Sequence, residues 1–519
     1  MVINELCSSN IDQWLDPSFN YGSWVELYNP TSSDIDVTGC FFSDDANVPR
    51  KARINDPTHI PAHGYAVFWF DNYDPVWTPH NIDMKLDCDG DTLYFNDSQG
   101  RNRITFIYPQ SVARCSWAAT SDGGHTYRFC AAPTPGRSNN GSPFSDYRLN
   151  EPVVDSESRI FTSGTQHLQV TIPEGCTLIY TTDGSAPTRT NGQVSVTGHF
   201  STSVTRTFRF ALFRDGYLPS PVVTRSLIKS DLDIDLPILA VTGTDKNFYD
   251  DSIGIFVKGV NGRPSHGPFG ICNWYNDWER PSVVEYFTSD GQSLLNQEAG
   301  IKRIGAFSRS FTPRSFRINA NKRYEMQNTL PYPFFSEKPY LKHKSVLVRN
   351  GGSDTICRIL DVALQQIVAR SAIDIDYQAY QPIWHIVNGV NKGTINLREP
   401  SNKHFVYANY GLDDDEIDQF EFATDSGYVQ KCGTYESMQH LLDLSSNAAS
   451  DDTYAQICQL LDIDEYCNYM AIEFYLRNGD WPENNCKGWR ARTADGRFRM
   501  VLFDLEAMDW IDDPSIFSK

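Results

Sequence analysis

The side chains best suited to chemistry lie close together in sequence, near the C-terminal end of the 519-residue chain. Asp480 is followed five positions later by Asn485, and Asp504 comes after two further apolar runs. Phosphoryl transfer needs a carboxylate that orients an acceptor hydroxyl and oxygen ligands that hold divalent ions on the transferred phosphate. An Asp, an Asn and a second Asp in this order can supply both kinds of group.

These residues need a scaffold that brings them together, and the surrounding pattern predicts one. Helical periodicity over about 465–477 indicates a helix that leads directly into the loop of Asp480. The runs 487–492 and 498–503 flank a turn and predict a tight hairpin that returns Asp504 to that loop. The same spacing occurs in the catalytic loop of protein kinases. The alternative is that the first Asp caps a helix and the asparagines only form turns.

The composition is that of a folded protein with several domains. At 519 residues, 40% hydrophobic and 21% charged, the chain is expected to form about three domains. The formal charge of −20 argues against nucleic-acid binding, because such proteins cluster Lys and Arg against phosphates. Carboxylates can still hold Mg²⁺. No apolar run reaches the roughly 18 residues that a membrane-spanning helix needs.

Cysteine usage and the N-terminus bear on the compartment. The 12 cysteines have irregular spacing, without C-x-x-C and without a Cys/His cluster at zinc spacing, which argues against a metal–cysteine site. Cys7 could pair with Cys40, and Cys115 with Cys130, or all could be buried free thiols. Residues 1–5 already have the pattern of a strand, so the sequence begins without a signal peptide. We expect a secreted or cell-surface protein whose leader is absent here; a cytoplasmic location is the alternative.

Residues 1–141 alternate short apolar strands with turn clusters, which is typical of a β-sandwich, and the Pro- and Gly-containing segment 133–143 is typical of a linker. Its ordered motifs are Ile3-Asn4-Glu5, Trp24-Val25-Glu26-Leu27-Tyr28-Asn29, Ser43-Asp44-Asp45, Ile60-Pro61 with Gly64-Tyr65, Asp89-Gly90 with Thr92-Leu93, and Pro133-Thr134-Pro135-Gly136. In these motifs it resembles the lamin-tail domain. The resemblance implies an immunoglobulin-like sandwich and no activity.

Residues 148–230 repeat the all-β pattern at smaller size. Their clearest element is Leu178-Ile179-Tyr180-Thr181-Thr182-Asp183-Gly184-Ser185-Ala186-Pro187-Thr188, in which an Asp-Gly turn closes a Thr-rich strand. This string is similar to one in the small sandwich at the C-terminus of chitobiase-like enzymes. The resemblance implies an accessory module, and carbohydrate binding by the sandwiches is considered but not favoured.

The third region follows the acidic stretch 230–235 and covers 236–519. Residues 356–373 carry helical periodicity, while 382–397 predict two strands around Asn388-Gly389. The expected fold class is therefore multi-domain, with two all-β immunoglobulin-like sandwiches followed by an α+β domain.

Ordered motifs run through about 270 residues of this third region. They are Leu236-Pro237-Ile238, Asn273-Trp274, Glu279-Arg280-Pro281, Gly300-Ile301-Lys302-Arg303-Ile304-Gly305, Ser308-Arg309, Pro313-Arg314-Ser315-Phe316-Arg317, Tyr332-Pro333-Phe334-Phe335, Leu347-Val348-Arg349-Asn350-Gly351-Gly352, Asp354, Asn388-Gly389, Gly393, Leu397-Arg398-Glu399, Asn478-Gly479-Asp480-Trp481 and Asp504-Leu505-Glu506. In these motifs the region resembles the CotH kinase family, atypical kinases named for a spore-coat protein. The resemblance implies an atypical protein-kinase-like fold, ATP and Mg²⁺ as cofactors, and a protein acceptor such as a surface or coat protein.

The family's site residues carry over onto matching positions of this chain. Asp480 takes the place of the catalytic Asp, and the metal-binding places fall on Asn485, Asp504 and Glu506. Cofactor binding is assigned to Lys302, Arg309, Arg314, Arg317 and Glu399. Relatives have Lys at the position of Arg314, and Arg binds phosphate with a different geometry, which puts that contact in doubt. The alternative is that single basic residues only cover an outer strand face and that Glu506 is solvated.

Two functional hypotheses follow from these residues. The first is ATP- and Mg²⁺-dependent phosphoryl transfer to a protein hydroxyl, with Asp480 orienting that hydroxyl. The second is a non-catalytic surface or scaffold protein whose kinase-like domain only binds. Because 15 residues follow Asp504, too few for the helices that finish a kinase lobe, we expect an incomplete C-terminal lobe and a natural gene that continues past Lys519. Whether this shortened form is active stays open.

Overall fold

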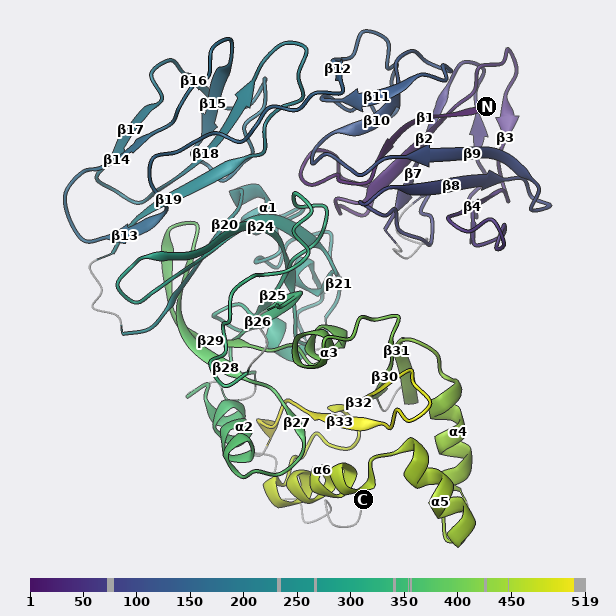
Figure 1. Cartoon of the computed structure of the whole chain (residues 1–519), viewed down its shortest axis with the longest axis vertical. Coiled ribbons are helices and arrows are strands. Elements are labelled where there is room, and N and C mark those ends of the chain that lie inside the picture. Colours follow the sequence, from purple (N-terminus) through teal and green to yellow (C-terminus); the bar gives the residue numbers. More distant parts are fainter. Residues whose placement is uncertain are drawn as a thin grey trace.

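The computed structural model describes residues 1–507 except 72–78, 231–234, 266–267, 339–341, 353, 355–356, 424–426 and 447. Over this part the chain is mostly β-sheet with few helices. Figure 1 shows two strand-rich modules side by side, a third strand-rich body below them, and a mixed lobe that carries most of the helices at the far end. Most of the predicted 230–235 boundary, and the residues on which an incomplete C-terminal lobe was predicted, lie outside the described ranges.

Residues 2–145 form two larger sheets around one core, and a two-stranded sheet of β3 and β6. The sheet orders are β12-β11-β10-β1-β2-β7 and β5-β4-β8-β9. Phe42 lies at the centre of the core, with its ring centroid 5.5 Å from that of Phe68 and 5.1 Å from that of Phe95. The alternation of short strands and turns predicted for this region is confirmed. The strands are β1 (Val2–Cys7), β2 (Ser23–Tyr28), β3 (Ile35–Asp36), β4 (Phe41–Ser43), β5 (Ala52–Arg53), β6 (His59–Ile60), β7 (Tyr65–Phe70), β8 (Asp91–Asn96), β9 (Asn102–Tyr108), β10 (Ser116–Ala119), β11 (Tyr127–Cys130) and β12 (Phe144–Ser145).

The second module pairs a sheet of order β13-β19-β18-β15-β16 with the two strands β14 and β17. Its Asp-Gly turn follows β15 and packs against the third body: a Cβ added to Gly184, which has a φ of 80°, would lie 2.6 Å from the carbonyl oxygen of Gly243. Glycine is therefore required at this contact. The strands are β13 (Arg159–Phe161), β14 (Gln166–Gln169), β15 (Thr177–Thr181), β16 (Gln193–Ser195), β17 (His199–Thr202), β18 (Arg206–Phe213) and β19 (Val223–Lys229).

The third body is a closed barrel of order β20-β23-β24-β25-β26-β29-β28, completed by parallel pairing of β20 with β28. Apolar side chains such as Ile301, Ile318 and Val346 fill it. The predicted hairpin at Asn388-Gly389 is confirmed, and both residues have the positive φ (48° and 73°) that its two-residue turn requires. The strands and helices are β20 (Ile238–Thr242), α1 (Asp245–Tyr249), β21 (Arg263–Pro264), β22 (Ile271–Cys272), η1 (Asn273–Tyr275), β23 (Glu279–Phe287), β24 (Ser293–Arg303), η2 (Phe307–Ser310), β25 (Phe316–Asn319), β26 (Ser345–Arg349), β28 (Tyr380–Val387) and β29 (Val390–Arg398).

The mixed lobe is built on a sheet of order β27-β33-β32-β30-β31. The helix predicted over 465–477 is confirmed as α6, whereas α2 is shorter than the predicted 356–373. The side chain of Asp354 accepts hydrogen bonds from the backbone at the start of α2. Ala372, just beyond the end of α2, has a left-handed φ of 59°, which stops the helix from continuing. The elements are α2 (Leu360–Arg370), β27 (Asp376–Tyr377), α3 (Lys403–Tyr410), β30 (Ile417–Ala423), β31 (Gly427–Cys432), α4 (Glu436–Ser445), α5 (Asp451–Leu460), α6 (Ile463–Leu476), β32 (Cys486–Ala491) and β33 (Arg499–Leu502).

Charged side chains from three modules meet beside the barrel. Glu298 of β24 bonds Arg114 of the first module at 2.8 Å and also bonds Arg209 of the second. Arg114 bonds Asp12 at 2.9 Å as well. Nearby, the indole nitrogen of the buried Trp278 donates to the carbonyl of Ser18 at 2.7 Å. These contacts join both N-terminal modules to the barrel.

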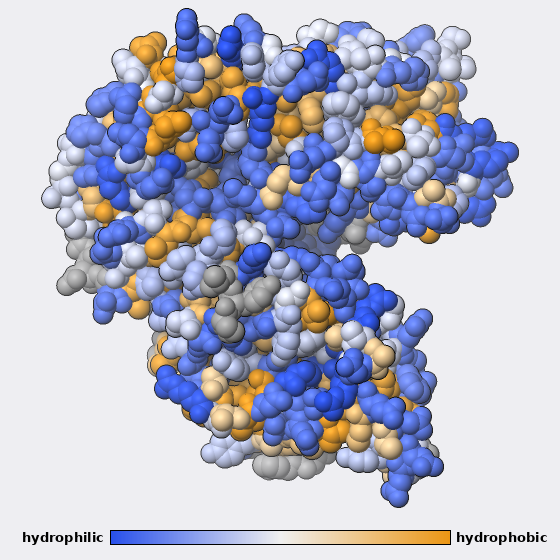
Figure 2. Space-filling model, in the orientation of Figure 1, coloured by the Kyte–Doolittle hydropathy of each residue, from blue (hydrophilic) through white to orange (hydrophobic). Residues whose placement is uncertain are grey.

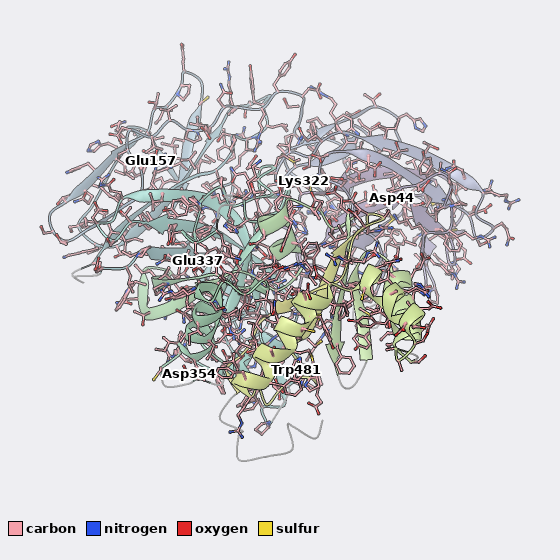
Figure 3. The ribbon with its side chains drawn as sticks, turned by 60° about the horizontal axis from the view of Figure 1, so that its bottom comes forward. Asp44, Glu157, Lys322, Glu337, Asp354 and Trp481 are labelled. Atoms are coloured by element: carbon pink, nitrogen blue, oxygen red, sulfur yellow. The ribbon has the colours of Figure 1, made fainter. Side chains whose placement is uncertain are left out.

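The first module also approaches the mixed lobe across a hollow. Figure 2 shows a notch in the molecular outline between these two parts. A cavity of about 420 Å³ is lined there by Asp44 and Lys85 of the first module, Lys322 of the barrel region and His404 of α3. Figure 3 labels Lys322 at the border between the first module and the rest of the molecule, where it also bonds Asp89.

All twelve cysteines lie in the described part of the chain, and all are free thiols, so neither Cys7 with Cys40 nor Cys115 with Cys130 is bonded. None of the helices over the described ranges has the length and apolar character needed to cross a bilayer.

Candidate functional site

Asp480 lies in the loop that follows α6. The helix ends at Arg477, which has a left-handed φ of 53°, so the chain turns sharply there. The buried Asn478 holds the turn, because its amide donates to the carboxyl of Glu473 one helical turn back at 3.0 Å. Burial raises the pKa of Glu473 to about 8, although this bond opposes the shift. Trp481, which follows Asp480 in the loop, is labelled in Figure 3 beside the helices of the lobe.

Asn485 joins the two acidic positions. Its side-chain amide lies 3.3 Å from the carboxylate Oδ2 of Asp480 and 3.3 Å from the backbone oxygen of Asp504. Asn484 adds a second contact of 3.2 Å to the other oxygen of Asp480. The hairpin of β32 and β33 brings these positions together, as predicted from the sequence. The Asp480 carboxylate stays exposed and available for a further partner.

The carboxylate of Asp504 has a partner in the barrel. It bonds the guanidinium of Arg349 at the end of β26. The same guanidinium bonds Glu506 at 2.7 Å. Glu506 is only 4% exposed, and burial raises its pKa to about 8 against the opposing charge of Arg349. The alternative that Glu506 is solvated is therefore wrong.

A second buried ion pair supports this segment from α2. Asp361 bonds the guanidinium of Arg398 in β29 and accepts the backbone N–H of Leu505 at 3.0 Å. Its pKa is lowered because the charges of Arg398 and Arg349, with these hydrogen bonds, outweigh the raising effect of its burial. The position of the Asp504 segment therefore depends on α2 and on two barrel strands.

Two of the predicted basic residues lie on the outer face of the barrel. Lys302 and Arg317 are paired across β24 and β25, so they share one face, and because Ile301 fills the barrel they lie on its outer side. Burial lowers the pKa of Arg317, and its Nε is buried without a hydrogen-bond partner among the described residues. Lys302 lies 3.4 Å from Asp277.

Lys487 of β32 completes this basic group from the other side. Its ammonium is 4.4 Å from the ring centre of Phe503, next to Asp504, and 3.2 Å from Glu421. Burial lowers the pKa of Lys487 against the opposing charge of Glu421, and the positive charge of Arg317 adds to the lowering.

The other residues assigned to cofactor binding are engaged within the protein. Arg309 bonds the carbonyl of Gly305 at 2.5 Å, and the guanidinium of Arg314 stacks 4.7 Å from the ring centre of Trp274. Glu399 is 1% exposed and accepts the backbone N–H of Ala379 at 2.9 Å. The amide of Asn409 donates to its other oxygen. These contacts neither test nor exclude nucleotide binding, and the assignments stay predictions.

The sequence analysis missed Lys487, Asp361 and the role of Arg349. Arg349 and Asp504 each lie in a family motif quoted above, and their pairing requires knowledge of the fold. Lys487 is the second residue of β32 and follows Asn485 by two positions, so its closeness to the site in sequence was visible.

Oxygen donors of the kind that bind Mg²⁺ are present at this site, but they do not all point to one place. In the ranges that the structure describes, no three His, Cys, Asp or Glu side chains are close enough to share an ion. Asp480 and Asn485 are adjacent through their side chains, and Asp504 contributes its carbonyl on that side.

Comparison with known proteins bears on this region directly. Residues 301–515 match the family model described as CotH kinase protein. The match begins in β24 and covers Asp480, Asn485, Asp504 and Glu506 together with Lys302, Arg317 and Lys487. It supports the CotH resemblance and a kinase-like function for this part of the chain. Both N-terminal modules lie outside the matched range, so their likeness to lamin-tail and chitobiase-like domains stays a prediction. No curated protein matches the chain.

Proposed function

We propose that the chain carries an ATP- and Mg²⁺-dependent protein kinase activity of CotH type. The observation that carries the proposal is the junction at Asn485, which joins the exposed Asp480 carboxylate to the Asp504 segment. In this proposal the exposed oxygen of Asp480 accepts a hydrogen bond from a hydroxyl of the acceptor protein and takes its proton as phosphate is transferred.

The residues present fit the cofactors. Carboxylate and amide oxygens are the ligands that Mg²⁺ prefers, and Asp504 and Asn485 would hold it. Arg317 would bind phosphate oxygens, because its buried Nε has no hydrogen-bond partner among the described residues. Lys487 and Lys302 would add positive charge on either side. Bound Mg²⁺ and ATP would supply the phosphoryl group and neutralise its charge.

Other predicted residues would act through the fold. Arg309 and Arg314 would fix the loops beside β24 and β25, since their guanidiniums bond backbone carbonyls at Gly305 and Ser310. Glu399 would hold the connection between the lobes through Ala379 and Asn409. The acceptor class, a protein of the cell surface or coat, and a secreted or cell-surface location are part of the proposal and rest on the family resemblance.

Transfer of labelled γ-phosphate from ATP to the chain itself or to a generic protein acceptor tests this function. Asp480→Asn should lower the rate by about 10² to 10⁴, the usual contribution of a positioned general base. Asp504→Asn should abolish transfer. Asp495→Asn, in the exposed turn of the β32–β33 hairpin, is the matched control and should transfer at the normal rate. Equal rates for Asp480→Asn and the control would reject the assignment of Asp480.

The second candidate is a non-catalytic scaffold whose kinase-like domain only binds. One observation favours it: the Asp504 carboxylate is already bonded to Arg349. A scaffold predicts no transfer by any variant, and no thermal stabilisation of the chain by millimolar ATP with Mg²⁺. Stabilisation that needs both ATP and Mg²⁺ favours the kinase.

A further inference from the structure

Arg349 is in an unusual position for a residue that the sequence analysis did not assign to the site. Its guanidinium bonds two carboxylates that are two residues apart in sequence, Asp504 and Glu506. Its side chain is 18% exposed, and that of Glu506 is 4% exposed. One guanidinium therefore bonds both acidic side chains, of which Glu506 is buried.

The surrounding backbone is shaped to allow this arrangement. Gly352 has a φ of 49°, and a Cβ added there would lie 1.9 Å from Oε1 of Glu506. Any larger residue would displace Glu506 from Arg349. On the other side, Asp361 accepts the N–H of Leu505 and fixes the backbone between the two acids. The bonds of Arg349 are thus built into the fold.

Because of these bonds, the Asp504 carboxylate is held by Arg349. Asn485 reaches only the backbone oxygen of Asp504, because the carboxylate is turned to Arg349. A divalent ion held by Asp504 and Asn485 would need that carboxylate to share its charge or to turn. The guanidinium and the metal are two cations that require the same acceptor.

We propose that Arg349 is a positioning residue that acts as an internal cation, bound to Asp504 before the metal and in competition with it. This inference rests on the proposed function, since it takes Asp504 as a metal ligand. Metal binding would release Asp504 from β26 while Glu506 keeps its bond to Arg349. The loading of the site with metal would thereby be coupled to the contact between the barrel and the mixed lobe.

The test is direct titration with Mn²⁺ without nucleotide, following free Mn²⁺ by electron paramagnetic resonance. Arg349→Gln removes the competing charge and should tighten Mn²⁺ binding by about tenfold, since unpaired carboxylates attract a divalent ion more strongly. Arg358→Gln is the matched control: Arg358 lines the same small cavity beside Glu506 but bonds the carbonyl of Thr312, so Mn²⁺ affinity should stay as in the wild type. The double variant Arg349→Gln with Asp504→Asn should not show the tighter Mn²⁺ binding of Arg349→Gln alone.

The outcomes separate this inference from the proposed function. If the wild type binds Mn²⁺ and Arg349→Gln binds it equally or more weakly, Arg349 only supports the fold and the competition is wrong, while the metal site stands. If neither binds Mn²⁺ at millimolar concentration, both the competition and the proposed metal site are wrong. Arg349→Met, which keeps the aliphatic stem, carries the same test if circular dichroism shows that Arg349→Gln is unfolded.

Discussion

Replacing Glu298 should destabilise the junction of the three modules more than any surface change. The four charges there are balanced, with Asp12 and Glu298 against Arg114 and Arg209. In Glu298→Gln, Arg114 keeps Asp12, but Arg209, whose side chain is 5% exposed, loses its carboxylate and keeps the carbonyl of Gly184 at 3.0 Å. An uncompensated buried charge of this kind costs about 3 to 5 kcal/mol. Because the amide can still accept one hydrogen bond, we expect a loss of about 3 kcal/mol.

Urea denaturation at pH 7, followed by tryptophan fluorescence, measures this loss in the transition that includes the barrel. Asp215→Asn is the control, because Arg189 and Asp215 form an exposed pair at 3.0 Å in the second module and should change stability by less than about 1 kcal/mol. The double variant Arg209→Met with Glu298→Gln removes one charge of each sign and should recover at least half of the loss. The predicted role of Glu298 is refuted if the free energy of unfolding of Glu298→Gln is within about 1 kcal/mol of that of the wild type. It is also refuted if the losses of Arg209→Met and Glu298→Gln simply add in the double variant.

Three further predictions address the site. Burial raises the pKa of Glu473 to about 8 from its ordinary value of 4.5, so we expect it to be protonated in the folded state at pH 7. Its stabilising effect is complete below pH 4.5 and is lost as the pH rises through 8. Glu473→Gln should therefore flatten the fall in the melting temperature between about pH 5 and 8. Arg317→Met and Lys487→Met should each weaken binding of ATP with Mg²⁺ by roughly tenfold or more, while adenosine binding measured by calorimetry stays unchanged; equal losses for adenosine would contradict a phosphate contact. Asp354→Ala should cost about 1 kcal/mol in urea unfolding, because its carboxylate accepts the N–H groups of Ile359 and Leu360 at the start of α2, and a cost below 0.3 kcal/mol would contradict this capping role.

Local patterns predicted the elements that carry the site. The hairpin at Asn388-Gly389, the helix before Asp480 and the hairpin before Asp504 each depend on residues that are close in sequence, and each is confirmed. The start of α2 was predicted too early, because the apolar period alone does not show where Asp354 caps the helix.

The contacts between distant segments could not be predicted. Arg349 and Asp504 are 155 residues apart, and the packing of the mixed lobe on the barrel brings them together. The predicted phosphate ligands show the same limit. Whether an arginine faces a cleft or bonds a nearby carbonyl, as Arg309 does at Gly305, depends on loop geometry that the spacing of charges does not contain. Lys302 and Arg317 are on the outer barrel face because their neighbours fill the core, an alternation that the sequence does show.

The central claim is that Asp504 and Asn485 hold a metal-bound nucleotide next to Asp480, with its phosphates between Arg317 and Lys487. A crystal structure with Mn²⁺ and a non-hydrolysable ATP analogue, using the anomalous signal of manganese, tests it most directly. We expect a manganese peak bonded to the Asp504 carboxylate and the Asn485 side-chain oxygen, with the triphosphate in contact with both cations. A nucleotide bound elsewhere, or a cleft that stays without nucleotide and manganese at millimolar concentrations while Asp504 remains on Arg349, would contradict the claim.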